Sequence, residues 1–269
     1  MTAPERNLPG SRPFLVLEIT RSSPVDQANG LVFRSVRERP RKEFRGRELV
    51  DRVLALVERV MPVQIWLVGG EPLVRRAEIG RLLPQFDRLG IEVQLATGAL
   101  LPIPYDYRTW DNLTIVVMVD ALQPGTCARI VDNISGHGVV VHCDIDRPLA
   151  CAPRRLREFV GFWSSRDEVL GMWFSLRGLT LPERAATVAE LASIRRTFPK
   201  VFLPDPIRSA FLHPPSGPDA CAFARMTHRV SPDFVVEAAP CPLGGNRVCS
   251  ECGSIASARL SAIGGFLAR

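Results

Sequence analysis

Six short apolar runs alternate with segments of helical periodicity, and this alternation constrains the fold more than any other feature of the chain. The apolar runs lie at residues 14–19, 63–68, 91–97, 113–120, 139–145 and 171–176. Amphipathic helical patterns lie at residues 47–61, 78–89, 156–163 and 182–198. Near-continuous apolar strands that alternate with helices are typical of a parallel sheet covered by helices. The pattern therefore predicts the α/β class.

A glycine-rich turn, Gly69-Gly70-Glu71-Pro72, directly follows the second apolar run. Glycine lacks a Cβ, so the main chain there can come within hydrogen-bonding distance of a bound molecule. Glu71 adds a charge at the carboxyl end of a predicted strand, where open α/β sheets place their ligands. An ordinary strand-to-helix turn explains the same residues, because short glycine motifs often arise by chance. Both interpretations stay open from these four residues alone.

Several segments, taken in chain order, resemble the radical S-adenosylmethionine (SAM) superfamily. The first run ends in L-E-I-T-R at residues 17–21, G-G-E-P follows the second, A-T-G ends the third at residues 96–98, and the fifth contains V-H-C-D at residues 141–144. The resemblance covers nearly the whole chain and implies a partial barrel of six β/α units. It also implies that the G-G-E-P turn contacts the methionine end of SAM.

The resemblance fails at the loop after the first strand. Family members carry three cysteines there, spaced C-x3-C-x2-C, which hold a four-iron cluster that binds SAM. In this chain Ser23, Gln27 and Gly30 occupy the aligned positions, and no cysteine precedes Cys127. Iron–sulfur clusters are held by thiolates, which serine, glutamine and glycine cannot replace together. Reductive cleavage of SAM at this loop is therefore not expected.

Four of the seven cysteines gather in the last fifth of the chain: Cys221, Cys241, Cys249 and Cys252, spaced C-x19-C-x7-C-x2-C. Cysteines in loops that end in a C-x2-C pair suit a tetrahedral thiolate site for zinc or an iron–sulfur cluster; unligated thiols and disulfides are the alternatives. The stretch from Cys241 onward resembles the SPASM or twitch domains of radical SAM proteins, which implies an auxiliary iron–sulfur cluster. Ser254 replaces the last cysteine of that pattern and leaves four candidate ligands.

Single polar residues on the predicted strands are weaker candidates. Alternation over residues 139–145 allows His142 to face a barrel interior, where an imidazole could bind a ligand or move a proton. Glu18 and Asp120 end two predicted strands, and Arg177 follows the last one, where a guanidinium could hold a carboxylate of SAM or a substrate. A hydrogen-bonded core role or a surface role is the simpler explanation of each residue.

The composition fits an enzyme-like body with a small extension. The 269 residues are 46% apolar, which is enough for one full core. The chain has no apolar stretch long enough to span a bilayer and no signal-like start, so cytoplasmic residence is expected. The net charge of +6 rests on arginine, with Lys42 and Lys200 the only lysines. A basic run at residues 34–47 suits a solvated loop better than a nucleic-acid surface, because glutamates interrupt it.

The sequence thus predicts a radical-SAM-like partial (β/α)6 barrel over residues 1–200 and a cysteine-rich, SPASM- or twitch-like metal-binding extension over residues 201–269. We expect a protein that has lost the SAM-cleaving cluster, binds SAM or a related ligand through Gly69, Gly70, Glu71 and Pro72 for non-radical chemistry, and keeps an auxiliary iron–sulfur (4Fe-4S) or zinc site. The alternative is a non-catalytic scaffold or partner protein of a biosynthetic or peptide-modifying radical SAM system. The expected partners are a small-molecule or peptide substrate and a partner protein, not nucleic acid or a membrane; a zinc-stabilised RNA binder ranks last.

Overall fold

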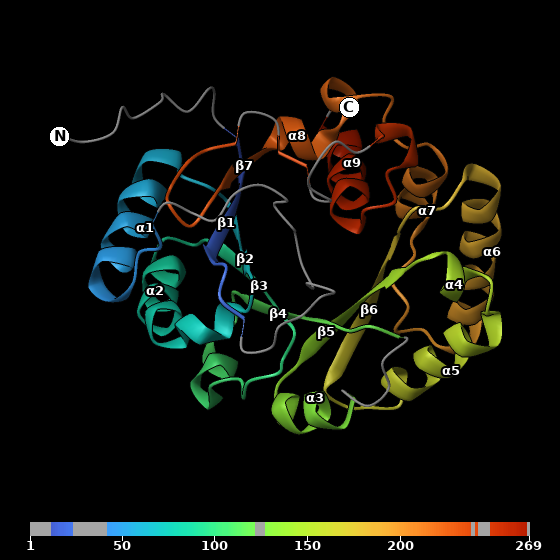
Figure 1. The fold of residues 1–269 in the computed structure, drawn as a ribbon, viewed down its shortest axis with the longest axis horizontal. Helices are drawn as coiled ribbons and strands as arrows, with labels where there is room; N and C mark the ends of the chain where they lie inside the picture. The colour runs from blue at the N-terminus through green and yellow to red at the C-terminus, as the bar shows by residue number, and fades with distance from the viewer. Residues whose placement is uncertain (1–11, 24–41, 122–126, 238–239, 242–247, 268–269) are drawn as a thin grey trace.

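The computed structural model describes residues 12–23, 42–121, 127–237, 240–241 and 248–267. These residues form a seven-stranded sheet in the order β6-β5-β4-β3-β2-β1-β7 (Figure 1). Every neighbouring pair of strands is parallel. The strands are β1 (Phe14–Thr20), β2 (Gln64–Gly69), β3 (Glu92–Thr97), β4 (Leu113–Met118), β5 (Val139–Ile145), β6 (Val169–Leu176) and β7 (Thr227–Val230).

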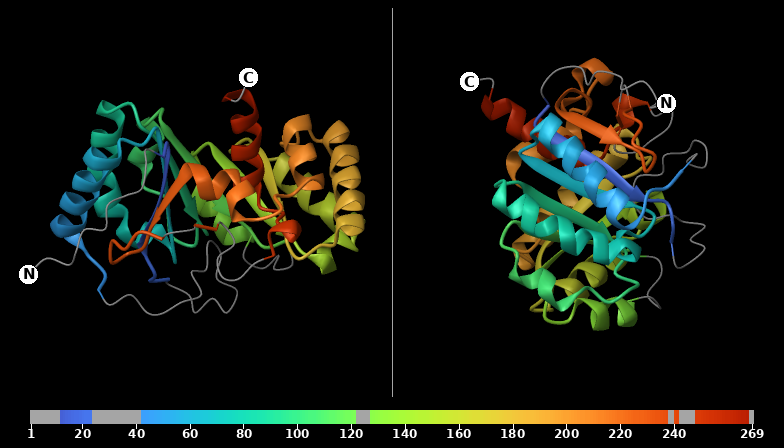
Figure 2. Two further views of the ribbon diagram at one scale, coloured as in Figure 1. Left: turned by 90° about the horizontal axis from the view of Figure 1, so that it is seen from above. Right: turned by 90° about the vertical axis from the view of Figure 1, so that its left-hand side faces the viewer.

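Helices α1 to α6 surround the outer face of the curved sheet, whereas α8 and α9 lie on its other side (Figures 1 and 2). The α-helices are α1 (Gly46–Val60), α2 (Arg76–Arg88), α3 (Cys127–Ile134), α4 (Arg147–Ala150), α5 (Pro153–Ser164), α6 (Leu181–Thr197), α7 (Asp205–Leu212), α8 (Ala222–Met226) and α9 (Ile255–Leu267). Short 3-10 helices are η1 (Pro72–Arg75), η2 (Tyr105–Thr109), η4 (Pro218–Ala220) and η5 (Cys249–Glu251). Among the described residues, none of these helices has both the length and the apolar character needed to cross a membrane.

Strands β1 to β6 lie in the sheet in the order in which they occur in the chain. A run of parallel strands in chain order, with helices on one face, is consistent with a TIM-barrel-like fold. The predicted α/β class with a parallel sheet is therefore confirmed. The sequence did not predict β7, which pairs with the outer side of β1 in a register that joins Phe14 to Thr227 and Leu17 to Val230.

Alternate side chains of β1 enter two different apolar clusters. Leu15 and Leu17 belong to the main core, which also contains the buried faces of the surrounding helices. Phe14 and Val16 point the other way and belong to a second cluster with residues of α8 and α9. Complete burial of such a side chain stabilises the fold by about 1.5–3 kcal/mol. The inner face of the sheet is thus partly covered by the carboxyl-terminal segment.

The predicted helices are confirmed, with boundaries that differ by no more than three residues from α1, α2, α5 and α6. The start of α6 illustrates why these helices can be predicted from local sequence. The backbone N–H of Thr180 donates to Oε2 of Glu183 at 2.8 Å, and Pro182 occupies the first turn. A side chain that caps the free donors and a proline in the first turn both favour a helix start.

The segment after residue 200 packs on the same core as the segment before it. Leu203, Phe211 and Ile255 all belong to the main apolar cluster. The fully buried Arg184 of α6 joins the two parts, because its Nη1 donates to the carbonyl oxygens of Phe211 at 3.1 Å and Cys252 at 3.0 Å. The two parts of the described chain therefore share one core, and a division into two domains at residue 200 stays a prediction.

Candidate functional site

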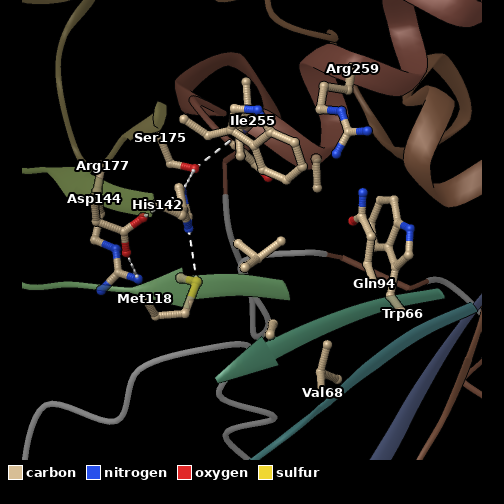
Figure 3. A pocket seen from close by; sticks show the side chains of 15 residues that line it. Trp66, Val68, Gln94, Met118, His142, Asp144, Ser175, Arg177, Ile255 and Arg259 are labelled. Atoms are coloured by element: carbon tan, nitrogen blue, oxygen red, sulfur yellow. Dashed lines mark hydrogen bonds and ion pairs between the residues drawn. The ribbon is translucent and has the colours of Figure 1, made fainter. Parts of the chain in front are cut away.

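A pocket that is partly open to solvent lies between the inner face of the sheet and the start of α9 (Figure 3). Residues two apart on a strand point to the same face, so β2 to β6 each contribute alternate side chains to one wall. Among them are Trp66 of β2, Gln94 of β3, His142 of β5 and Trp173 of β6. Arg259 of α9 faces them from the opposite side.

His142 lies in a short chain of polar contacts along the pocket wall. Its Nδ1 is 3.1 Å from Sδ of Met118, and its Nε2 is 2.9 Å from Oγ of Ser175. The backbone N–H of Ile255, the first residue of α9, donates to the same Ser175 oxygen at 3.1 Å. The contacts therefore link β4, β5 and β6 to the amino terminus of α9.

The surroundings of His142 favour its neutral imidazole. Its burial lowers the pKa below the ordinary value, while Asp144 opposes and Arg177 adds to that shift. Because Ile255 donates to Oγ of Ser175, the Ser175 hydroxyl proton can point toward Nε2 of His142. A thioether sulfur can only accept, so the contact with Met118 favours the ring proton on Nδ1.

Asp144 and Arg177 form an ion pair at the rim of the pocket, with 2.5 Å between Oδ2 and Nη2. Oδ1 of Asp144 lies 3.7 Å from Nε2 of His142, on the same ring nitrogen that Ser175 contacts. In a nucleophilic triad the acid and the nucleophile contact different ring nitrogens. The arrangement is therefore not a Ser-His-Asp triad. The sequence-based expectation that His142 faces the interior agrees with this position.

Both glycines of the G-G-E-P turn pack against the loop after β1. A Cβ on Gly69 would overlap the carbonyl oxygen of Thr20, and a Cβ on Gly70 would overlap that of Ser22. Gly69 also has φ of +150°, a conformation that favours glycine. The N–H groups of Gly70 and Glu71 donate to Thr20 and Ser22 at 2.8 Å each. Close packing within the chain explains both glycines, and their contact with a ligand stays a prediction.

The side chain of Glu71 is buried, with 2% of its surface exposed, and the chain itself satisfies it. Oε1 accepts from the N–H of Leu73 at 3.0 Å and the hydroxyl of Thr97 at 2.6 Å, and Oε2 accepts from the N–H of Gly98 at 3.0 Å. Burial raises its pKa, and these hydrogen bonds oppose the shift. The carboxylate thus ties the turn after β2 to the turn after β3. Pro72 begins η1 beside it.

The loop after β1 is described only as far as Ser23, so Gln27 and Gly30 lie outside the described residues. Glu18 is buried on β1, where Arg21 lies 3.3 Å and Arg229 3.9 Å from its carboxylate oxygens. Burial raises the pKa of Glu18, and both arginines oppose that shift. The described lining of the pocket includes neither Glu18 nor Asp120, whereas it includes Arg177.

The four carboxyl-terminal cysteines come into one region. Burial raises the pKa of the Cys249 and Cys252 thiols, and repulsion from Cys221 and Cys241 raises both further. Sγ of Cys221 lies 3.5 Å from Oγ of Ser257 on α9. Across the described ranges, however, no three His, Cys, Asp or Glu side chains approach closely enough to hold a metal ion. The structure gathers the predicted ligands, and metal binding by them stays a prediction.

The glycine that follows the C-x2-C pair docks this region onto the sheet. The N–H of Leu176, the last residue of β6, donates to the carbonyl oxygen of Gly253 at 2.7 Å. A Cβ on Gly253 would overlap the carbonyl oxygen of Leu176. The cysteine segment and α9 therefore meet β6 through a backbone contact that only glycine permits.

Sequence reasoning did not find Trp66, Gln94, Trp173 or Arg259. The first three carry a usable signal, because each lies on a predicted strand and strand alternation groups residues by face. Arg259 carries none, since the apolar stretch around it has no strand-like or amphipathic pattern. Its place in the pocket depends on how α9 crosses the inner face of the sheet.

Comparison with known proteins gives one partial similarity. No protein-family model matches the chain. A 7-carboxy-7-deazaguanine synthase of Hyperthermus butylicus, a radical SAM enzyme, is 34% identical over 62 residues. The similarity covers 23% of this chain and 26% of the relative, so the chain spans about a quarter of the length of the curated relative that it matches. It supports a weak relation to radical SAM enzymes.

Proposed function

We propose that this protein has a partial (β/α)6 barrel of radical SAM type with a SPASM- or twitch-like cysteine-rich extension. In this proposal the chain has lost the SAM-cleaving cluster and binds SAM or a related ligand in the inner pocket for non-radical chemistry. The proposal unites the parallel sheet, the partial similarity to a radical SAM enzyme and the altered loop after β1.

The position of the pocket is the observation that carries the proposal. It lies on the inner face of β2 to β6, and its lining includes Val68, the residue directly before Gly69. Parallel α/β folds place their ligands at the carboxyl ends of the strands. The described lining does not include Gly69, Gly70, Glu71 or Pro72, so a ligand in this pocket would have to extend past Val68 to reach the G-G-E-P turn. Glu71 holds that turn against the turn after β3.

The residues after β1 do not fit a four-iron cluster. Ser23, Gln27 and Gly30 supply no thiolate, and thiolates are the ligands that such clusters require. We therefore derive no electron transfer to SAM at this loop. Attack of a nucleophile on the carbon next to the SAM sulfonium requires no electron, because the neutral thioether leaves with the bonding pair.

The chain's own residues supply binding and proton handling for such chemistry. The apolar part of the lining, which includes Val68 and Met118, excludes water from the reacting groups. Neutral His142 has an unprotonated ring nitrogen that can accept a proton released by a nucleophile. Asp144, 3.7 Å from Nε2, would stabilise the imidazolium that forms.

The carboxyl-terminal donor set fits a thiolate metal centre by its chemistry. Four cysteines lie near enough to raise the pKa of Cys249 and Cys252 by mutual repulsion, and a bound cation removes that repulsion. The buried Arg184 adds a positive charge beside Cys252, as an anionic thiolate centre would favour. Cys221, Cys241, Cys249 and Cys252 would hold an iron–sulfur cluster or zinc, which would keep the extension folded on β6.

A non-catalytic scaffold or partner protein is the second candidate function. One observation favours it: the N–H groups of Gly70 and Glu71 and the Glu71 carboxylate all bind other parts of the chain. A turn whose polar groups are satisfied internally is stable without a ligand. In that case a peptide or an active radical SAM protein would be the partner.

Anaerobic purification followed by metal analysis and calorimetric titration with SAM separates the two candidates. The proposal expects SAM binding, one auxiliary metal centre that is lost in Cys249→Ala/Cys252→Ala, and no 5′-deoxyadenosine when SAM and dithionite are added. Metal without SAM binding would favour the scaffold. Formation of 5′-deoxyadenosine would refute the loss of reductive cleavage, and a preparation free of metal would refute the auxiliary site.

A further inference from the structure

Arg259 places a positive charge in the pocket, and no carboxylate of the described residues pairs with it. In the described part of the chain it forms no ion pair, although twelve pairs between an arginine or lysine and a carboxylate are present there. Its guanidinium carbon lies 4.1 Å from the ring centroid of Trp173, so the ring face supports one side of the group. Burial lowers the pKa of Arg259 to about 10, which still leaves it charged at neutral pH.

Gln94 fixes the direction of the guanidinium. With its amide oxygen turned toward α9, Gln94 accepts hydrogen bonds from Nη1 and Nη2 of Arg259 at 2.9 and 3.3 Å. The two side chains approach one another from β3 and α9 in Figure 3. A guanidinium has five N–H donors, so a single amide oxygen leaves most of them available. The Trp173 ring and the Gln94 amide thus hold the Arg259 guanidinium in place, and its remaining N–H groups can still bind an acceptor.

The other ionisable groups of the pocket leave the Arg259 charge uncompensated. Arg177 is paired with Asp144 at 2.5 Å, and His142 is neutral because of its burial. The described part of the pocket lining therefore carries one excess positive charge. One charge matches a carboxylate better than a phosphate dianion, and the planar guanidinium fork matches the planar carboxylate in shape.

We propose that Arg259, supported by Trp173 and Gln94, is the binding site for the carboxylate of a small ligand in this pocket. The rest of the ligand includes a flat ring system. Trp66 supplies a rigid wall for it, since its ring packs on Phe223 at 5.7 Å and its Nε1 donates to Gln64 at 2.7 Å. This inference rests on the proposed function because it names the ligand chemistry of the same pocket. The carboxylate belongs to SAM itself or to a second small molecule.

Two probe pairs, each with and without a carboxylate, test the inference on the full chain with its metal. The first pair is SAM and decarboxylated SAM, and the second is quinoline-2-carboxylate and quinoline-2-carboxamide. We expect at least one carboxylate probe to bind at least tenfold more tightly than its uncharged or decarboxylated counterpart. The pair that shows this preference identifies the source of the carboxylate.

Arg259→Gln should remove the preference by weakening the carboxylate probe at least tenfold and leaving its counterpart unchanged. Arg154→Gln is the matched control, because its side chain is 92% exposed on α5 and the change removes the same charge outside the pocket. Gln94→Glu offers a second variant that should fold well. Its new carboxylate pairs with Arg259, so it should raise the unfolding temperature and yet abolish binding of the carboxylate probe.

The outcomes separate this inference from the proposed function. SAM binding that is equal in wild type, Arg259→Gln and Gln94→Glu, together with no Arg259-dependent binding of quinoline-2-carboxylate, overturns the Arg259 site and leaves the SAM proposal standing. Binding of quinoline-2-carboxylate that depends on Arg259, without any SAM binding, supports the site and overturns the SAM proposal. If neither carboxylate probe binds the wild-type protein, both ideas are wrong.

Discussion

Glu71 shows at the scale of one residue how a motif side chain can be fully occupied within the fold. Its two carboxylate oxygens accept three hydrogen bonds from the turns after β2 and β3. Burial raises its pKa, so the charged form is costly unless all of these donors stay in place. The residue therefore fixes the relative position of two turns at the carboxyl end of the sheet.

Replacing Glu71 by alanine should lower the free energy of unfolding by about 3 kcal/mol, because three buried donors lose their acceptor. Glu71→Gln, which keeps one acceptor oxygen, should cost less. Chemical denaturation measures both changes, and Glu58→Ala at an exposed position of α1 is the control. A loss for Glu71→Ala no larger than that of the control would show that the carboxylate does not hold the turns together.

His142 should make stability depend on pH in a definite direction. Its pKa is lowered in the folded state, so below about pH 6.5 the unfolded chain binds more protons than the folded one. The stability that neutral His142 contributes is present above pH 6.5 and is lost as pH falls through the lowered folded value. His142→Gln should therefore lose less stability than wild type between about pH 6.5 and pH 5. Equal pH slopes for the two proteins would contradict a buried, neutral imidazole.

At the scale of elements, α9 covers the pocket, and contacts with β6 hold α9 in place. The contact depends on Gly253, where a backbone hydrogen bond to Leu176 and the lack of a Cβ bring two main chains together. Two residues after Gly253, at the start of α9, the N–H of Ile255 donates a hydrogen bond to Oγ of Ser175. The position of Arg259 in the pocket is a consequence of this docking.

Gly253→Ala should destabilise the protein by about 1–3 kcal/mol, since the added methyl group overlaps the Leu176 carbonyl and forces α9 away from β6. Hydrogen exchange should increase at the backbone amides of Leu176 and Ile255. The matched control is Gly217→Ala, because a Cβ at that position meets no atom within 4 Å. Unchanged exchange at both amides would mean that the docking contact is dispensable.

Local sequence patterns predicted strands β1 to β6 and the helices on the outer face of the sheet. They did not predict that the carboxyl-terminal segment covers the inner face. The apolar runs and the caps of helices such as α6 are short-range signals, and they placed β1 to β6 correctly. β7 has four residues and includes the polar Thr227 and Arg229, so its sequence does not read as a strand. Its pairing with β1, like the arrival of Arg259 in the pocket, is a long-range contact that periodicity does not contain.

At the scale of the whole molecule, the carboxyl-terminal segment completes the structure that begins at β1. It adds β7 to the sheet, covers Phe14 and Val16, and supplies the carbonyl groups that bind the buried Arg184. An arginine buried without those acceptors would cost several kcal/mol. The chain is therefore expected to unfold as one cooperative unit.

A truncated chain that ends at residue 200 should not form a stable fold, because β1 loses its neighbour β7 and Arg184 loses the carbonyl acceptors of Phe211 and Cys252. Near-UV circular dichroism and thermal unfolding would show the loss as an absence of fixed aromatic packing and of a sharp transition. The full-length protein should give a single transition under the same conditions. Cooperative unfolding of the truncated chain would instead support an independent domain over residues 1–200.

A crystal structure of the anaerobically purified protein soaked with SAM tests the proposed function most directly. We expect SAM in the inner pocket between β2 to β6 and α9, next to the G-G-E-P turn. We also expect no iron cluster at the loop that contains Ser23, Gln27 and Gly30. A SAM-bound iron cluster at that loop, or a pocket that stays empty at saturating SAM, would contradict the proposed function.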